Sequence, residues 1–131
     1  KQTLFIIKME QILLIDDDAV INFVHTKIIA SVYPDATVVI LENGKKAVEY
    51  IQQNQQNSYL VFLDINMPIM DGWQFLEAMQ DFPNKDNLRI HMLTSSVDLR
   101  DQSRAADNNM VLSYLSKPLT RDVLRSIPVQ Q

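Results

Sequence analysis

Five short apolar runs alternate with segments of helical periodicity along the 131 residues of the chain, and this alternation restricts the fold more than any other feature. Most of the runs are continuously apolar, which is typical of strands buried on both faces of a sheet. Strands that alternate with helices favour a parallel sheet with helices packed on both sides. The expected strands are residues 11–16, 37–41, 60–64, 89–94 and 112–116.

The segments between these strands carry local signals for helix ends. Side chains that accept hydrogen bonds from the first free backbone N–H groups of a helix precede several of them. The signals are a cap at Asp18, Gly44 before the second helix, a capping-box pair at Asp71 and Gln74, a fourth helix over about 98–108, and a fifth from Thr120 to before Pro128. In the first helix, a broad apolar stripe is expected to face the sheet. Its members are Val20, Ile21, Val24, Ile28 and Ile29.

The charge balance and composition exclude several kinds of partner and site. The formal net charge is -4, so the chain lacks the basic surface that direct nucleic-acid binding requires. It has no cysteine, which excludes disulfides and thiolate metal sites. No apolar stretch approaches the roughly 18 residues of a membrane span. We therefore expect a cytoplasmic protein that contacts neither membrane nor nucleic acid.

The chain is long enough for one domain, which we place at residues 10–131, with residues 1–9 as an N-terminal extension. The start superficially suggests a signal peptide. Its apolar core is confined to residues 4–7 and no small-residue cleavage site follows, so we reject that interpretation.

Polar side chains stand where four of the expected strands end. Asp16 and Asp17 close the first strand, Asp64 the third, and Thr94 the fourth, while Lys117 follows the fifth. In open parallel sheets, ligands bind outside the carboxyl ends of the strands, near the point where the strand order reverses. We expect these carboxylates, the hydroxyl and the ammonium group to converge at one edge of the sheet.

The three carboxylates suit a hard divalent cation such as Mg²⁺, which prefers oxygen ligands. Without a cation, two carboxylates ~5 Å apart repel by about 3 kcal/mol at an effective dielectric constant near 20. Asp17 and Asp64 would supply ligands directly, with Asp16 holding a coordinated water. The alternative is that acidic residues after strands only cap helices, and we assign that role to Asp18.

Asp64 is the candidate nucleophile. A carboxylate forms an aspartyl phosphate when a metal and cations neutralise the transferring oxygens. Thr94 would donate a hydrogen bond to the phosphoryl group, and Lys117 would supply a positive charge. Asp71 and Gly72 begin the next helix and receive no chemical role.

Four motifs in chain order resemble the receiver domain of two-component response regulators, and in particular the single-domain, chemotaxis-regulator-like members. They are Ile-Leu-Leu-Ile-Asp16-Asp17-Asp18, Leu63-Asp64-Ile-Asn-Met-Pro-Ile-Met-Asp71-Gly72, Met-Leu-Thr94-Ser95 and Tyr114-Leu-Ser-Lys117-Pro118. The resemblance runs from about Gln11 to Ile127. It implies a doubly wound (βα)₅, flavodoxin-like α/β three-layer sandwich with strand order 2-1-3-4-5.

The resemblance also implies a phosphorylation-dependent signalling switch, not an enzyme. Asp64 would be loaded from a histidine kinase or a histidine phosphotransfer protein and would act on a downstream protein, with a phosphorylation-linked dimer as a further option. Asp16, Asp17, Asp64 and the main-chain carbonyl of Asn66 would bind Mg²⁺. Thr94 and Lys117 would contact the phosphoryl group. Tyr114 would be the aromatic switch, and the peptide bond between Lys117 and Pro118 would be cis.

Two other interpretations compete with a signalling switch. A phosphohydrolase of the haloacid dehalogenase type also forms an aspartyl phosphate, but it requires a second Asp two residues after the nucleophile. Asn66 stands at that position. A scaffold with a vestigial site would lack some of Asp17, Asp64, Thr94 and Lys117, and none is missing. The two histidines, His25 and His91, are interpreted as structural.

Overall fold

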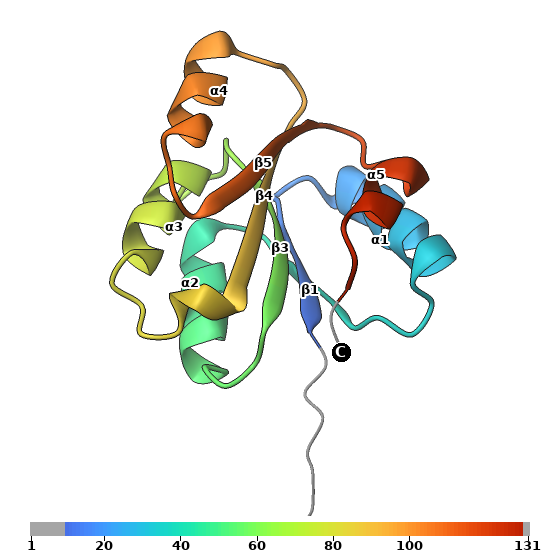
Figure 1. Cartoon of the computed structure of the whole chain (residues 1–131), viewed down its shortest axis with the longest axis horizontal. Coiled ribbons are helices and arrows are strands. Elements are labelled where there is room, and N and C mark those ends of the chain that lie inside the picture. Colours follow the sequence, from blue (N-terminus) through green and yellow to red (C-terminus); the bar gives the residue numbers. More distant parts are fainter. Residues whose placement is uncertain (1–9, 130–131) are drawn as a thin grey trace, which may run out of the picture.

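The computed structural model describes residues 10–129 and contains one parallel sheet of five strands in the order β2-β1-β3-β4-β5 (Figure 1). This order and the alternation of strands and helices confirm the expected doubly wound fold. The elements are β1 (Gln11–Ile15), α1 (Ala19–Val32), β2 (Val38–Leu41), α2 (Gly44–Gln53), β3 (Tyr59–Asp64), α3 (Gly72–Met79), β4 (Leu88–Thr94), α4 (Leu99–Ala106), β5 (Val111–Ser116) and α5 (Arg121–Ser126), with a 3₁₀ turn at Lys85–Asn87. The expected extension, residues 1–9, lies outside the described residues.

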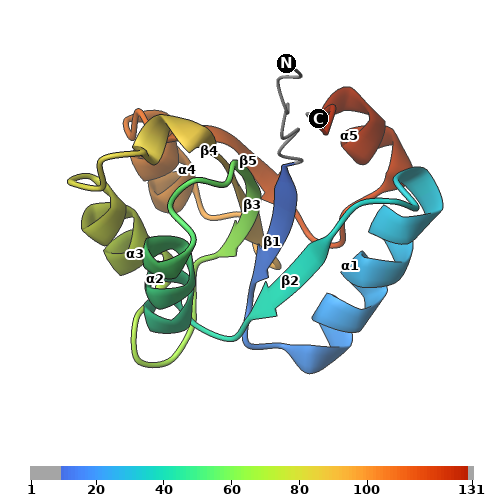
Figure 2. The same cartoon turned by 90° about the horizontal axis from the view of Figure 1, so that it is seen from below.

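Helices cover both faces of the sheet, as Figures 1 and 2 show. Helices α2, α3 and α4 pack on one face through Ile51, Phe75 and Ala105, together with strand residues such as Leu13 and Val61. Helices α1 and α5 cover the opposite face through residues that include Ile29 and Leu124, which pack against the alternate strand residues. Because β1, β3 and most of β4 are buried on both faces, the sheet centre is apolar throughout, as the continuous apolar runs predicted.

The register of the strands brings the polar residues at their carboxyl ends together. Ile15 of β1 pairs with Leu63 of β3, so Asp16 and Asp64 follow neighbouring positions. Thr94 of β4 pairs with Ser116 of β5, which places Lys117 one residue beyond. The convergence expected from the sequence therefore follows directly from parallel pairing.

The buried face of α1 differs from the expected apolar stripe. Val20 is 74% exposed, and the residues that α1 buries are Asn22, His25 and Ile29. The stripe prediction was wrong for Val20 because Asn22 and His25 make hydrogen bonds inside the protein and therefore face the sheet, which rotates Val20 towards solvent. The sequence pattern counted apolar residues alone and missed these polar ones.

The caps at the helix ends largely follow the sequence signals. Asp18 accepts hydrogen bonds from the backbone N–H groups of Val20 and Ile21, and Asp71 forms a capping box with Gln74. Helix α2 begins at Gly44 itself and is capped by the buried side chain of Asn43, which we had not singled out. Thr120 caps α5, which ends at Ser126, before Pro128.

Two glycines allow the loop after β3 to pack closely beside its neighbours. A Cβ atom at Gly72 would overlap the backbone carbonyl oxygen of Asp64, and one at Gly44 would lie 2.8 Å from the carbonyl oxygen of Met70. The N–H of Gly44 instead donates to that Met70 oxygen at 2.9 Å. Gly72 thus does more than begin α3, because it lets the helix approach the end of the strand that carries Asp64.

Between these glycines, Ile69 has a φ angle of 69° and is 75% exposed. The N–H of Met70 donates to the carbonyl oxygen of Pro68 at 2.7 Å, so Ile69 is the central residue of a tight turn. A β-branched residue at positive φ is sterically strained. The loop that leads away from Asp64 is therefore held in an unfavourable backbone conformation by its surroundings.

No helix within residues 10–129 is both long enough and apolar enough to cross a bilayer. On the sheet face that α1 and α5 cover, Arg89 of β4 forms an ion pair with the buried carboxylate of Glu10 and donates to the carbonyl oxygen of Pro128. The ion pair and this hydrogen bond together connect β4 with both ends of the described chain.

Candidate functional site

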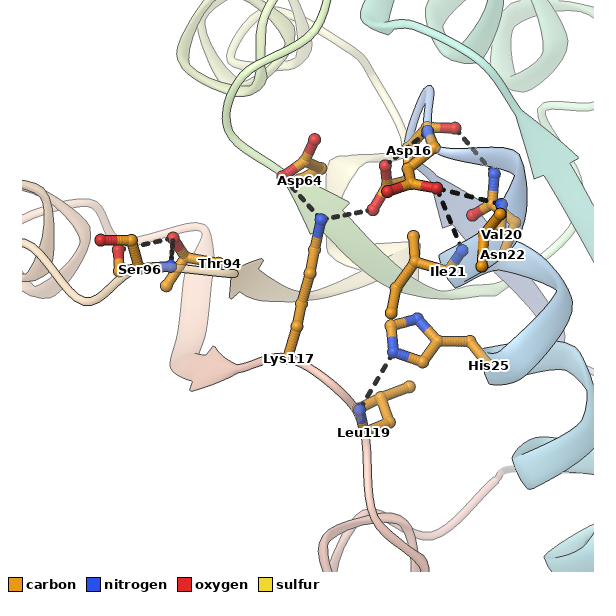
Figure 3. A network of polar contacts seen from close by, with 11 residues as sticks. Asp16, Val20, Ile21, Asn22, His25, Asp64, Thr94, Ser96, Lys117 and Leu119 are labelled. Carbon is orange, nitrogen blue, oxygen red and sulfur yellow. Dashed lines mark hydrogen bonds and ion pairs between the residues drawn. The ribbon is translucent and has the colours of Figure 1, made fainter.

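The site is assembled at the carboxyl ends of β1, β3 and β5, where Lys117 lies between two carboxylates (Figure 3). Its Nζ is 2.6 Å from Oδ2 of Asp16 and 3.1 Å from Oδ1 of Asp64. All three side chains are nearly inaccessible, with 10%, 6% and 11% of their surfaces exposed, respectively. Water screens charges weakly in such a setting, so each carboxylate interacts strongly with the ammonium group.

Asp17 completes a cluster of three carboxylates. One oxygen from each of Asp16, Asp17 and Asp64 lies within 4.8 Å of the others, and Asp17 is the exposed member. The structure thus brings together the three side chains expected to surround a metal. Asp18 is correctly interpreted as a cap, because its carboxylate accepts from the first turn of α1.

The charges around Asp64 shift its protonation equilibrium. Burial raises the pKa of Asp64 above its ordinary value of 3.8, and the neighbouring Asp16 carboxylate raises it further, while Lys117 offsets part of the shift. Burial alone would lower the pKa of Lys117, but hydrogen bonds to Asp16 and Asp64 outweigh it and raise the pKa above 10.5. The surroundings therefore favour the charged form of Lys117, and additional positive charge beside Asp64 would favour its ionised form.

The Thr94 hydroxyl makes its hydrogen bonds away from the carboxylates. It donates to the carbonyl oxygen of Ser96 at 2.8 Å and accepts from the Ser96 N–H at 3.2 Å (Figure 3). The Thr94 backbone does contact the site, because its carbonyl oxygen accepts from the Lys117 N–H at 2.7 Å. Thr94 thus lies beside the candidate site, and its hydroxyl is hydrogen-bonded to the backbone of Ser96 in the loop after β4.

Tyr114 lies on β5 and pairs with Met92 of β4. Its hydroxyl oxygen is buried and has no hydrogen-bond partner among residues 10–129. The ring borders a cavity of about 240 Å³ against α4. The other residues that line this cavity are Gln102, Ala105, Ala106, Val111, Leu112 and Ser113.

The structure also places Asn66 and the peptide bond between Lys117 and Pro118, both of which the resemblance singled out. Asn66 follows Asp64 by two residues, and its side chain is exposed. The peptide bond between Lys117 and Pro118 is cis, as expected.

Two residues beside the site received no part in it from the sequence: Asn22 was not considered, and His25 was interpreted only as structural. Asn22 Nδ2 donates to the backbone carbonyl oxygen of Asp16 at 2.9 Å, and His25 Nε2 accepts from the Leu119 N–H at 3.0 Å (Figure 3). Their spacing with Ile29, at positions i, i+3 and i+7, matches one face of a helix. That spacing was the available signal, but polar side chains do not contribute to an apolar pattern.

The sequence profile of the response regulator receiver domain matches residues 12–127. The chain belongs to the response regulator receiver domain family. Receiver domains of two-component systems work in phosphorylation-dependent signalling, interact with histidine kinases or phosphotransfer proteins, and are switches rather than classical enzymes.

Solved structures and curated relatives agree with this family. A two-component response regulator from Cytophaga hutchinsonii is 34% identical, with a TM-score of 0.82, over 91% of this receiver chain and 93% of that chain. The Mn²⁺-bound form of response regulator Rcp1 shares the fold, with a TM-score of 0.72 and 24% identity, over 89% of this chain and 88% of that chain. The sensor histidine kinase CheAY from Helicobacter pylori is 26% identical over 70% of this receiver chain.

The receiver chain spans only part of its curated relatives. Four of them are longer proteins of which the chain covers between 11% and 41%. Their likeness concerns the receiver domain they share with this chain.

Proposed function

We propose that the protein is a phosphorylation-dependent switch in which Asp64 accepts a phosphoryl group with the help of Mg²⁺. The observation that carries this proposal is the buried pairing of Lys117 with both Asp16 and Asp64, beside the exposed Asp17. A nucleophilic carboxylate, a metal-binding pair and a cation stand together where phosphoryl transfer needs them.

The donor set fits a divalent cation. Three carboxylates lie close together, and within residues 10–129 the ammonium group of Lys117 is the one cation that pairs with Asp16 and Asp64, so the cluster has more acidic groups than basic ones. Oxygen ligands of this kind are those that Mg²⁺ takes. Asp16, Asp17 and Asp64, with the main-chain carbonyl of Asn66, would hold the ion. Rcp1, whose likeness concerns the fold alone, is a precedent for a divalent metal in a protein of this fold.

In the proposed transfer, Asp64 is the group of the chain that exchanges bonds with phosphorus. A carboxylate oxygen of Asp64 attacks phosphorus and forms an O–P bond, while the bond between phosphorus and the donor breaks and its electron pair leaves with the donor. With phosphohistidine, the leaving atom is a ring nitrogen that then takes up a proton. When bound, Mg²⁺ supplies charge neutralisation for the phosphoryl oxygens. Lys117 would move from the bare carboxylate to the new phosphoryl group.

The residue two positions after Asp64 does not favour a hydrolase. A haloacid dehalogenase type enzyme uses a second carboxylic acid two residues after the nucleophile to protonate the leaving group. Asn66 occupies that position, and its amide has no acidic proton to give. We therefore propose a histidine kinase or a histidine phosphotransfer protein as donor and a downstream protein as the target of the phosphorylated form.

The proposal is tested with acetyl phosphate as a small donor. In the presence of Mg²⁺, the intact mass should rise by one phosphoryl group, and both Asp64→Asn and the addition of a chelator should abolish the rise. Asp71→Asn is the matched control, because Asp71 lies in the same loop and serves as a helix cap. The assignment fails if the Asp64→Asn protein is labelled as strongly as the wild type.

A further inference from the structure

The buried face of α1 carries two polar side chains on successive turns, and both bind the backbone beside the site. Asn22 is 4% exposed and His25 is 1% exposed. Burying a polar group costs free energy unless it finds a hydrogen-bond partner. Asn22 donates to the carbonyl oxygen of Asp16, and His25 accepts from the N–H of Leu119. Helix α1 is thereby tied to the β1–α1 loop and to the β5–α5 loop.

The contact of His25 fixes the segment that carries Lys117. Leu119, two residues after Lys117, is only 2% exposed. On the other side of this segment, the Lys117 N–H donates to the Thr94 carbonyl oxygen at 2.7 Å. The backbone from Lys117 to Leu119 is thus held from β4 at one end and from α1 at the other. The Lys117 side chain extends from this segment to Asp16 and Asp64 (Figure 3).

We propose that His25 is a positioning residue for phosphoryl transfer, acting through the backbone of Leu119 to hold the ammonium group of Lys117 opposite Asp64. This inference rests on the proposed function. His25 touches neither the carboxylates nor the phosphoryl group, and its effect passes through the loop alone. Asn22 anchors the partner of Lys117 in the same way, by fixing the backbone of Asp16.

A neutral histidine can accept the hydrogen bond from Leu119 without adding a negative charge near Lys117. The Nε2 atom accepts a hydrogen bond only when it carries no proton, so the ring must be neutral. Burial lowers the pKa of His25 below 6.5, and of the two charges near the ring, Asp16 opposes this shift and Lys117 adds to it. A carboxylate in place of the ring would also accept from Leu119, but it would compete with Asp64 for Lys117. A neutral acceptor leaves the whole charge of Lys117 to the site.

The test compares three variants of the whole chain. His25→Leu removes the acceptor, whereas His25→Gln retains one, because the Gln amide oxygen reaches about as far as Nε2. Ile29→Ala is the matched control, because Ile29 is fully buried one turn further along the same face and packs in the apolar core of that layer. The rate of Asp64 phosphorylation by acetyl phosphate at saturating Mg²⁺ is measured for each variant, together with the NMR signal of the Leu119 amide.

We expect His25→Leu to slow phosphorylation about tenfold, since small misplacements of a reacting constellation cost factors of this order or more. His25→Gln should restore a rate close to that of the wild type, and Ile29→Ala should keep the wild-type rate although it destabilises the fold. The Leu119 amide signal should move in the leucine variant and stay near its wild-type position in the glutamine variant.

A wild-type rate in His25→Leu, with the Leu119 signal displaced, would overturn the inference, and so would an equal slowing by Ile29→Ala. If His25→Leu does not fold, His25→Asn replaces it, because its shorter side chain cannot reach Leu119. Absence of labelling in the wild type would instead count against the proposed function, which separates the two failures.

Discussion

At the scale of single residues, the site depends on Lys117. Its ammonium group is the cation that contacts both Asp16 and Asp64 at ion-pair distance, and all three side chains are largely buried. Removing one partner from a buried ion pair leaves an uncompensated charge and is strongly destabilising. In the proposed function the same ammonium group would contact the phosphoryl group, and a bound Mg²⁺ would then supply the positive charge between the carboxylates.

The division between metal ligand and helix cap predicts different effects for two adjacent residues. Asp17→Asn should weaken Mg²⁺ binding at least about tenfold, since even outer partners of metal ligands change affinity by roughly 10–100-fold. Asp18→Asn should leave Mg²⁺ affinity nearly unchanged, because Asn also caps helices well. Mg²⁺ titrations followed by calorimetry measure both. Equal affinities in the two variants would show that the division is wrong.

Ile69 provides a prediction about stability. Its φ of 69° favours glycine, and its side chain is 75% exposed, so little apolar burial is lost on truncation. Ile69→Gly should raise the free energy of unfolding by about 1 kcal/mol, because left-handed backbone costs other residues roughly 1–2 kcal/mol. The control is Val97→Gly, since Val97 is 56% exposed and does not share the positive φ. Urea denaturation that shows Ile69→Gly to be as destabilising as Val97→Gly would contradict the strain argument.

At the scale of elements, we propose that β4 and β5 carry two residues that act together as a switch, Thr94 at the end of β4 and Tyr114 within β5. The Thr94 hydroxyl is bonded to Ser96 within its own loop. The Tyr114 hydroxyl is buried and has no partner in the described part of the chain, and Tyr114 lines a cavity together with residues of α4. A phosphoryl group on Asp64 would offer the Thr94 hydroxyl a stronger acceptor. Reorientation of Thr94 would break its bonds to Ser96 and alter the space available to Tyr114, which is a population shift between two arrangements.

Thr94→Ala should therefore allow phosphorylation but uncouple it from Tyr114. Aromatic NMR with and without beryllofluoride, a phosphoryl mimic, compares the ring in the wild type and in the variant. The account predicts a change of Tyr114 environment in the wild type that is absent or much smaller in Thr94→Ala. An unchanged ring in the wild type, or an equal change in the variant, would remove Thr94 from the mechanism.

The same scale shows what the sequence could and could not predict. The convergence of Asp16, Asp64 and Lys117 was predictable, because parallel strands place their carboxyl ends at one edge, whereas the strand order was implied by the resemblance to receiver domains. The inward direction of Asn22 and His25 was not predicted, because it depends on backbone partners that exist only in the fold: the carbonyl oxygen of Asp16 for Asn22 and, 94 positions along the chain, the N–H of Leu119 for His25. The positive φ of Ile69 likewise results from contacts of the folded loop and has no local signal in the sequence.

At the scale of the whole molecule, two buried neutral histidines make stability depend on pH. Burial lowers the pKa of His25 and of His91, and the Arg89 charge adds to the effect on His91, whose Nδ1 pairs with Ser113 Oγ at 2.6 Å. The unfolded chain therefore takes up protons near pH 6.5 before the folded chain does. The stability that these residues contribute is fully present above that pH and is lost as the pH falls through it.

We expect the free energy of unfolding to fall between about pH 7.5 and pH 5.5, and to fall less when His25→Gln and His91→Gln are combined. Asp64 acts in the opposite sense, because its raised pKa favours the folded state as the pH falls towards 3.8. Urea denaturation is therefore also measured in proteins that carry Asp64→Asn, because this substitution removes the contribution of Asp64 to the pH dependence. If the free energy of unfolding changes with pH equally in the wild type and in the double histidine variant, the assignment of two neutral buried rings is contradicted.

The measurement that tests the central claim most directly is the chemical identification of the phosphorylated residue. Borohydride reduces an aspartyl phosphate to homoserine, which peptide mass spectrometry locates in the chain. After treatment with acetyl phosphate and Mg²⁺, the account predicts homoserine at position 64 and its absence when Mg²⁺ is chelated. Homoserine at Asp16 or Asp17, or phosphate on His25 or His91 with none at Asp64, would contradict it.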